Sequence, residues 1–382
     1  MRQELSLGAR AALAAICMAA IAPAGCGSGS GEAFFRAKGQ GDRAYSSGRY
    51  EEAAREYESA AGRAIRARDR AEALYLEGSS YARAKSAVRA RATFERLVAE
   101  LPASDRAHRA SFDLADLEID AGNVDRGYEL LCRAMTEHPN DGLARRALER
   151  WVGHLRENDK DALAWLREAL PRFAATELDE TVRYLIAENL EARSDLVGAR
   201  DAYLGCADLH PYPQGSLFDD ALWHASLLEE KLGHSAEAIG HLRRMLHERE
   251  VSTFAGSYER PRFSAARFRI AVLYRDRVRD HAAARRAFHE VYAEHKTSIL
   301  RDDALWEEAK LARADGDARA TCSIAATLRA EFADSRYAPC ASSLCPALPA
   351  PATPCRPYLL RENAAPPSDD GAENSDAKGG GN

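Results

Sequence analysis

A small residue recurs along this chain at nearly constant spacing, and this periodicity limits the folds that the chain can adopt. Successive recurrences are separated by 37, 37, 35, 37, 39, 46 and 37 residues. The recurring residues are Ala53, Ala90, Gly127, Ala162, Ala199, Ala238, Ala284 and Thr321. A fixed period of this length indicates one supersecondary unit that is stacked many times. The sequence therefore predicts an all-α solenoid of about eight helix-turn-helix repeats.

The clearest copy is AEALYLEGSSYARAKSAVRARATFERLVAELPAS, at 71–104. Gly78 and Ala90 are expected where the first helix of the repeat (helix A) crosses the second (helix B), because only small side chains let two backbones approach. Phe94 then fills the gap with a ring, and Pro102 ends helix B. This pattern resembles the tetratricopeptide repeat (TPR). The resemblance implies a right-handed TPR superhelix over residues 33–339, with helix A on its concave face.

The fourth copy fits the pattern less well than the others. Arg150 and Gly153 stand where a small residue and an aromatic residue are expected. Two interpretations are open, an irregular repeat or a bend in the superhelix.

The N-terminus has the features of an export signal. The apolar run at 11–22, AALAAICMAAIA, is too short to span a bilayer and follows Arg2 and Arg10. Ala24-Gly25-Cys26 after this run resembles a bacterial lipobox. The resemblance implies a signal peptide at 1–25 and a mature Cys26 that carries diacylglycerol and an amide-linked acyl chain such as palmitate. Residues 26–32 are then a flexible tether.

A second processing route is open for the same segment. Pro23 stands where a lipobox has a large aliphatic residue, and Ala22-Pro23-Ala24 is itself an A-x-A cleavage site. Cleavage there would release a soluble periplasmic or secreted protein. Because Gly27 is not an aspartate retention signal, we expect the lipidated form at the outer membrane, facing the periplasm.

The charge pattern excludes some partner classes. The net charge is −6 and 29% of residues are charged, with arginine and glutamate interleaved along the helices. We find no basic stripe that would indicate nucleic acid and no polybasic cluster that would indicate anionic lipid.

Four cysteines gather near the C-terminal end, at Cys322, Cys340, Cys345 and Cys355. In an oxidising compartment they predict two disulfides that fix a Cys/Pro-rich cap, 340–360, to the last repeat. Three pairings are open, and a Cys₄ zinc site is the alternative. Prolines are expected to keep this cap from being helical. Cys132 and Cys206 are predicted to be buried free thiols, and residues 361–382 a disordered acidic tail.

No catalytic or cofactor motif accompanies the repeats, so we expect a binding protein and not an enzyme, without cofactor or metal. In TPR proteins, position 5 of helix A usually faces a ligand. Five copies carry an aromatic residue there, at Tyr75, Phe112, Tyr184, Trp223 and Trp306. These rings are a candidate partner groove. The alternative is that they pack against the adjacent repeat.

Repeats and anchor together resemble the TPR lipoproteins of the outer-membrane barrel-assembly machinery, the BamD-like group. The resemblance implies a scaffold that binds envelope proteins or peptide segments, held at the membrane by its lipid. A periplasmic coordinator of peptidoglycan synthesis, of the Tol-Pal system or of a motility or secretion complex is the alternative, and an envelope enzyme is the alternative of another class.

Overall fold

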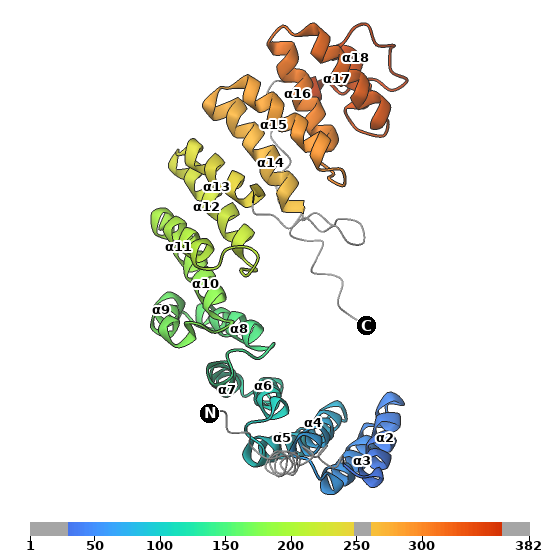
Figure 1. Ribbon diagram of the computed structural model, residues 1–382, viewed down its shortest axis with the longest axis vertical. Helices are drawn as coiled ribbons and strands as arrows, with labels where there is room; N and C mark the ends of the chain where they lie inside the picture. Colours follow the sequence, from blue (N-terminus) through green and yellow to red (C-terminus); the bar gives the residue numbers. More distant parts are fainter. Residues whose placement is uncertain (1–29, 248–260, 361–382) are drawn as a thin grey trace, which may run out of the picture. The chain divides into compact units, whose positions relative to one another are not determined.

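The computed structural model of the protein describes residues 30–247 and 261–360, which form helices and contain no strand (Figure 1). The first helices of the successive pairs are α2 (Glu32–Ser46), α4 (Ala67–Arg83), α6 (Asp105–Asp120), α8 (Ala144–Glu157), α10 (Asp179–Ala192), α12 (Phe218–Leu232), α14 (Pro261–Leu273) and α16 (Arg301–Ala314). The second helices are α3 (Tyr50–Arg63), α5 (Ala87–Glu100), α7 (Val124–Glu137), α9 (Ala162–Phe173), α11 (Leu196–Leu209), α13 (Ser235–His247), α15 (His281–Glu294) and α17 (Ala318–Glu331). The prediction of an all-α solenoid of helical hairpins is confirmed. The predicted signal peptide (1–25) and acidic tail (361–382) lie outside the described residues.

The recurring small residue has the same structural role in nearly every pair. It is buried in every copy. It is also the fourth residue of helix B in every copy except the fourth, where Ala162 is the first residue of α9. Gly78 shows why the slots are small. A Cβ atom on Gly78 would lie 2.5 Å from Phe94 Cε1, so the ring of helix B packs directly on the backbone of helix A.

The turn between helices A and B is similar in each pair, and in the seventh a π-helical turn, Tyr274–Val278, comes before it. One residue adopts a left-handed conformation, with φ between 54° and 87°, and the next N–H closes the end of helix A, as Ser86 N–H does on Tyr81 O (2.9 Å). These left-handed residues are Gly48, Lys85, Gly122, Asp159, Ser194, Gly233, Arg279 and Gly316. The turn geometry therefore recurs even where glycine, its favoured residue, is absent.

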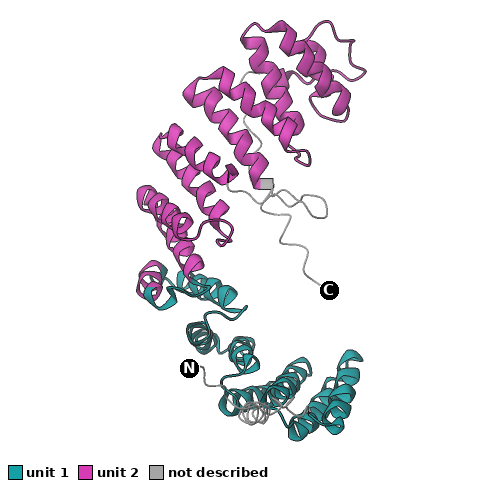
Figure 2. Cartoon of the chain, viewed as in Figure 1, with its two compact units in different colours: residues 1–162, 171–178 teal, residues 163–170, 179–382 magenta. Residues whose placement is uncertain are grey.

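The chain divides into two compact units (Figure 2). Unit 1 comprises residues 1–162 and 171–178, and unit 2 comprises 163–170 and 179–382. The division falls within α9, in the copy that departs from the sequence pattern. Helix α9 also contains Pro171. Each unit has its own core, around Phe34, Leu74 and Phe94 in unit 1 and around Tyr203, Trp223 and Phe288 in unit 2.

The end of the predicted tether, 26–32, is attached to unit 1. Ser30 is buried, its hydroxyl donates to Asp69 (2.5 Å), and it accepts from Ile65 N–H (3.2 Å). Helix α2 then begins at Glu32. Only residues 26–29 of the predicted tether precede this attachment, and they lie outside the described residues.

The C-terminal cap contains more helix than expected. A 3₁₀ turn at Ala338–Cys340, the short helix α18 (Ala341–Leu344) and a second 3₁₀ turn at Pro357–Leu360 occupy it. The expectation of a non-helical segment is wrong here because Pro339 lies in the first turn of the helical stretch, where a missing N–H costs nothing. Among residues 30–247 and 261–360, no helix combines the length and apolar character that a membrane crossing requires.

Candidate partner-binding surface

Three of the five predicted groove rings are buried in the cores of their units. The exposed fractions are 2% for Phe112, 7% for Trp223 and 0% for Trp306. Trp223 belongs to the hydrophobic cluster that joins successive hairpins of unit 2, and Trp306 to the cluster that joins the eighth hairpin to the C-terminal segment. The prediction of a partner groove is therefore wrong for these three residues, because their rings are almost wholly buried.

Tyr75 and Tyr184 are partly exposed, but both also contact a neighbouring helix pair. The guanidinium of Arg106, from α6, lies 4.9 Å from the Tyr75 ring centroid. The edge of Tyr184 faces Tyr203 at 5.2 Å, and its ring lies 6.1 Å from that of His224 in α12. Both tyrosines thus remain candidates for contact with a partner, Tyr75 in unit 1 and Tyr184 in unit 2.

Charged side chains cover Trp223 on the helix-A side of unit 2. The guanidinium groups of Arg262 and Arg269, both in α14, lie 5.8 Å and 5.9 Å from its ring centroid. Arg262 also pairs with Asp220 at 2.5 Å, and Arg269 pairs with both carboxylate oxygens of Glu230. Each arginine therefore joins α14 to α12 through a cation–π contact and an ion pair.

The same kind of ion pair continues along the first helices of unit 2. Lys231 of α12 pairs with Glu191 of α10 at 3.0 Å. Glu307 of α16 accepts from Arg275 at 2.5 Å and pairs with Lys310 at 2.8 Å. We call this surface the helix-A face of unit 2, and its residues are Glu191, Asp220, Glu230, Lys231, Arg262, Arg269, Arg275, Glu307 and Lys310.

The helix-A face is only partly desolvated. Exposed side-chain fractions run from 10% at Glu307 to 52% at Lys231, with Arg262 and Arg269 near 30%. The more exposed of these ion pairs, such as Lys231–Glu191, contribute little to stability, so a partner can replace them at small cost. The face carries both acidic and basic side chains, so it can bind a polypeptide segment that presents charges of both signs, from carboxylates and from guanidinium or ammonium groups.

Sequence reasoning missed these charged residues. Arg269 occupies position 5 of helix A, which is aromatic in five other copies. An arginine at this position was therefore a sign in the sequence that the face is charged there. Glu230 lies 39 residues before Arg269, close to one repeat length. A search for opposite charges one repeat apart would have found this pair, because equivalent faces of neighbouring repeats adjoin.

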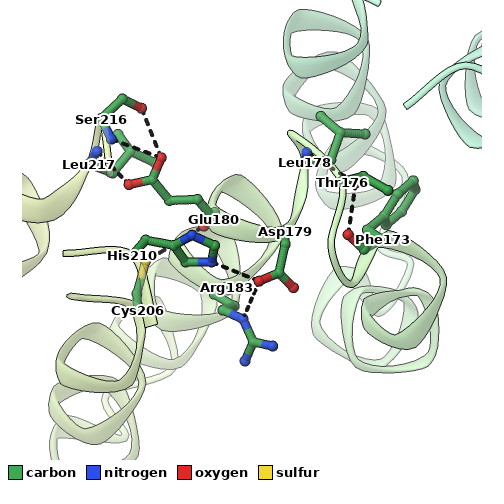
Figure 3. A network of polar contacts seen from close by, with 10 residues as sticks. All are labelled: Phe173, Thr176, Leu178, Asp179, Glu180, Arg183, Cys206, His210, Ser216 and Leu217. Carbon is green, nitrogen blue, oxygen red and sulfur yellow. Dashed lines mark hydrogen bonds and ion pairs between the residues drawn. The ribbon is translucent and has the colours of Figure 1, made fainter. Parts of the chain in front are cut away.

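A polar network fixes the start of α12 in unit 2 (Figure 3). Both carboxylate oxygens of Glu180 accept hydrogen bonds, from Leu217 N–H at 2.7 Å and from Ser216 N–H and hydroxyl at 3.1 Å and 2.9 Å. Leu217 is the residue that precedes the first turn of α12. Glu180 thus ties the beginning of one helix A to that of the next, and so positions Trp223.

Asp179, beside Glu180, holds the loop that precedes α12. It contacts His210 at 2.7 Å and Arg183 at 2.9 Å (Figure 3). Burial raises the pKa of Asp179, but the hydrogen bonds from Arg183 and His210 outweigh it, so the pKa is lowered. The aspartate is therefore ionised at neutral pH, and it anchors His210 at the end of α11.

Cys206 lies one helical turn before His210, which raises the question of a thiol nucleophile. Its sulfur contacts the Glu180 carbonyl oxygen at 3.6 Å, whereas His210 is bound to Asp179. Burial raises the pKa of the thiol to about 12, so it is protonated and unreactive at neutral pH. Across the described residues, no group of three or more His, Cys, Asp or Glu side chains is placed to hold a metal ion.

The disulfide Cys322–Cys345 joins the cap to α17 of the last repeat, and Cys340–Cys355 closes a loop within the cap. This is one of the three pairings that the sequence left open. Cys132 and Cys206 are free, Cys206 buried and Cys132 only partly. Tyr337, just before the cap, stacks on Trp306 with centroids 5.1 Å apart and an interplanar angle of 14°. Asp303 of α16 accepts from the Tyr337 hydroxyl at 2.6 Å. Tyr337 therefore covers Trp306, which is another reason why this ring is closed to a partner.

Comparison with known proteins identifies the repeat. Residues 72–104, most of the second hairpin, match the tetratricopeptide-repeat family. A search of curated proteins found no match. Among solved structures, the C-terminal part of a TPR repeat-containing protein from Cytophaga hutchinsonii is similar, at 11% identity and a TM-score of 0.43, over 71% of this chain and 98% of that chain.

Two further solved structures show the same kind of similarity. A tetratricopeptide repeat protein from Parabacteroides merdae is 10% identical, with a TM-score of 0.32, over 72% of this chain and 98% of that chain. The TPR2AB domain of yeast Sti1, solved as a pHSP90 complex, is 15% identical, with a TM-score of 0.28, over 71% of this chain and 95% of that chain.

Proposed function

We propose that this protein is an exported, lipid-anchored scaffold of the bacterial cell envelope that binds protein partners on the helix-A face of unit 2. The observation that carries the proposal is this charged, partly exposed face, on which Arg262 and Arg269 of α14 pair with Asp220 and Glu230 of α12. The signal-like segment and Cys26 support the envelope location. A role in outer-membrane protein assembly is the specific form of the proposal that the lipoprotein resemblance favours.

Site-specific photo-crosslinking tests the binding face. A photoreactive amino acid replaces Lys231, on the helix-A face, or Glu237, an exposed residue of helix B in the same hairpin. We expect a discrete crosslinked partner in intact cells from position 231 and none from position 237. Equal crosslinking from both positions would contradict the assignment of the face.

Charge reversal then tests the residues. Arg262→Glu with Arg269→Glu is expected to reduce the crosslink from position 231 by about tenfold or more, because arginines at protein interfaces often dominate binding energy. The matched control is Arg146→Glu with Arg319→Glu, which makes the same change in charge at two exposed positions outside the face. The identity of the crosslinked protein separates an assembly role from coordination of peptidoglycan synthesis, Tol-Pal, motility or secretion.

The mass of the mature protein tests whether Cys26 carries a lipid anchor. Intact mass of the membrane-extracted protein and of Cys26→Ala is measured after expression with the native leader. A triacylated Cys26 supports the lipoprotein form. A soluble product that begins at Gly25 would establish the alternative, a soluble periplasmic or secreted protein, and would remove the membrane constraint on its partners.

A further inference from the structure

The attachment of Ser30 places one surface of unit 1 next to the proposed lipid. Only residues 26–29 separate Cys26 from Ser30, and an extended chain spans at most about 3.6 Å per residue, or roughly 14 Å in all. Ser30 is bound to Asp69 and to Ile65 N–H, at the turn between α3 and α4. If Cys26 carries the anchor of the proposed function, this turn is therefore held beside the bilayer.

The turn is rich in arginine and presents an apolar side chain. Residues 63–70, RAIRARDR, contain Arg63, Arg66, Arg68 and Arg70 and one acid, Asp69; we call them the basic turn. Ile65 is 67% exposed, and the Arg68 side chain is 77% exposed. The chain has a net charge of −6, so this concentration of cations is a local exception. From the sequence alone we found no polybasic cluster and so did not identify this turn.

Acidic neighbours neutralise only part of this charge. Asp69 contacts Arg66 at 2.8 Å and Arg68 at 3.5 Å, and Glu100 pairs with Arg70 at 2.5 Å. Four arginines therefore face two acids. The Arg63 guanidinium donates to Ser59 O of its own helix, so its charge stays available at the exposed surface.

An open hollow of about 440 Å³ lies beside Ile65 and is lined by two arginines, Arg66 and Arg70, together with Glu100 and Leu101. A second exposed apolar side chain, Phe35, is 55% exposed in the first turn of α2, where its N–H donates to Gly31 O. Exposed apolar side chains among arginines are the combination by which peripheral proteins enter the interface of an anionic bilayer.

We propose that the basic turn is a membrane-contact surface that binds anionic phospholipid headgroups, with Ile65 inserted among them. This inference rests on the lipid anchor of the proposed function for its location, but the binding itself needs no anchor. The surface would orient unit 1 on the bilayer, because the anchor and the basic turn make two attachments. It would also strengthen membrane association beyond that of the acyl chains.

Vesicle binding of the unacylated protein tests the proposal. The chain from residue 26 to 382 with Cys26→Ser is mixed with vesicles of phosphatidylglycerol and phosphatidylethanolamine, or of phosphatidylcholine alone. We expect binding to the anionic vesicles only, and weaker binding as salt is raised. Absence of binding, or equal binding to both vesicles, would overturn the proposal.

Two variants identify the residues. Arg63→Glu with Arg68→Glu is expected to lower the partition coefficient by about tenfold or more, while the control Arg146→Glu with Arg319→Glu, which makes the same charge change, leaves it close to the native value. Ile65→Ser is expected to lower it by about threefold and to keep the salt dependence. Loss of binding in the control pair as large as in the turn pair would refute the assignment. Because acylation and partner crosslinking are measured separately, failure here is distinguishable from failure of the proposed function.

Discussion

The second and the eighth helical hairpins have similar helices but complete their cores differently. In the second, the ring of Phe94 in helix B packs on Gly78 of helix A, so the hairpin fills its own interior. In the eighth, the equivalent helix-B position is Ala325, and the volume is filled by Trp306 of helix A and by Tyr337, just before the cap. The eighth hairpin therefore depends on a segment outside itself.

This difference shows what a repeat position specifies. The slot requires that a volume be filled at native density, but it does not fix which element supplies the side chain. An internal hairpin has neighbours on both sides, whereas the last one has a free side that a cap must cover. The two disulfides and the Trp306–Tyr337 stack serve that need in unit 2.

The largest expected effect comes from removing the ring that the cap covers. Trp306→Ala should destabilise the eighth hairpin by about 3–5 kcal/mol, because a fully buried ring leaves a large cavity. Hydrogen exchange of amides in α16 and α17, compared with α4 and α5, measures this. We expect faster exchange in α16 and α17 only. Tyr337→Phe, which keeps the stack and loses the bond to Asp303, is the control and should cost far less.

Loss of one disulfide should have the next largest effect. Cys340→Ser with Cys355→Ser opens a link between residues 15 apart in sequence, worth about 3 kcal/mol in the chain-entropy description. Exchange should again accelerate in α16, α17 and the cap, and a reducing agent, which opens both disulfides, should cause at least as large a change in the native protein. An equal change in the second hairpin, which has no disulfide, would refute the idea that the cap acts locally.

The second hairpin is tested through its close contact. Gly78→Ala places a Cβ atom against the Phe94 ring and should cost about 1–3 kcal/mol through overpacking. Gly153→Ala in α8 is the matched control, because its Cβ meets nothing within 4 Å, and a gain of up to about 1 kcal/mol in helix propensity is expected. Urea denaturation monitored by circular dichroism compares the two. A tolerated Gly78→Ala would mean that the ring can move aside.

The smallest effect concerns Glu77, a buried acid of the second hairpin. Burial raises the pKa of Glu77 even though Arg96 and a hydrogen bond from Thr93 oppose the shift. The folded state therefore binds the proton more tightly than the unfolded state, and the charged form costs stability at neutral pH.

Glu77→Gln should accordingly change stability by less than about 1 kcal/mol at pH 7. The native protein should gain stability relative to this variant as pH falls from the raised pKa towards the ordinary value. Burial also raises the pKa of Glu308 in the eighth hairpin, so Glu308→Gln should show the same sign. Urea denaturation of each variant and the native protein at both ends of this pH range checks the direction. If the free energy of unfolding of the native protein fell relative to that of the variants on acidification, the assignment would be contradicted.

The sequence was sufficient for the repeat because its helices depend on local chemistry. Small residues mark helix crossings, so the periodicity alone located helix B in every copy, and the fourth copy, where the two units divide, was recognised from Arg150 and Gly153 as fitting the pattern less well. The aromatic slots were also found correctly. Whether a ring in such a slot faces a partner or the next repeat depends on what covers it, and no local pattern encodes that.

The sequence by itself thus determined an all-helical stack of hairpins, the position of the copy that fits the repeat pattern least well, and the cysteines available to the cap. Only the tertiary structure decided that Trp223 and Trp306 are core, that arginines cover Trp223, and that Ser30 is bound at the basic turn. The physical reason is that periodic burial follows from contacts within one repeat. Exposure and ion pairing depend on side chains about one repeat away, as between Arg269 and Glu230, which meet only when the hairpins stack.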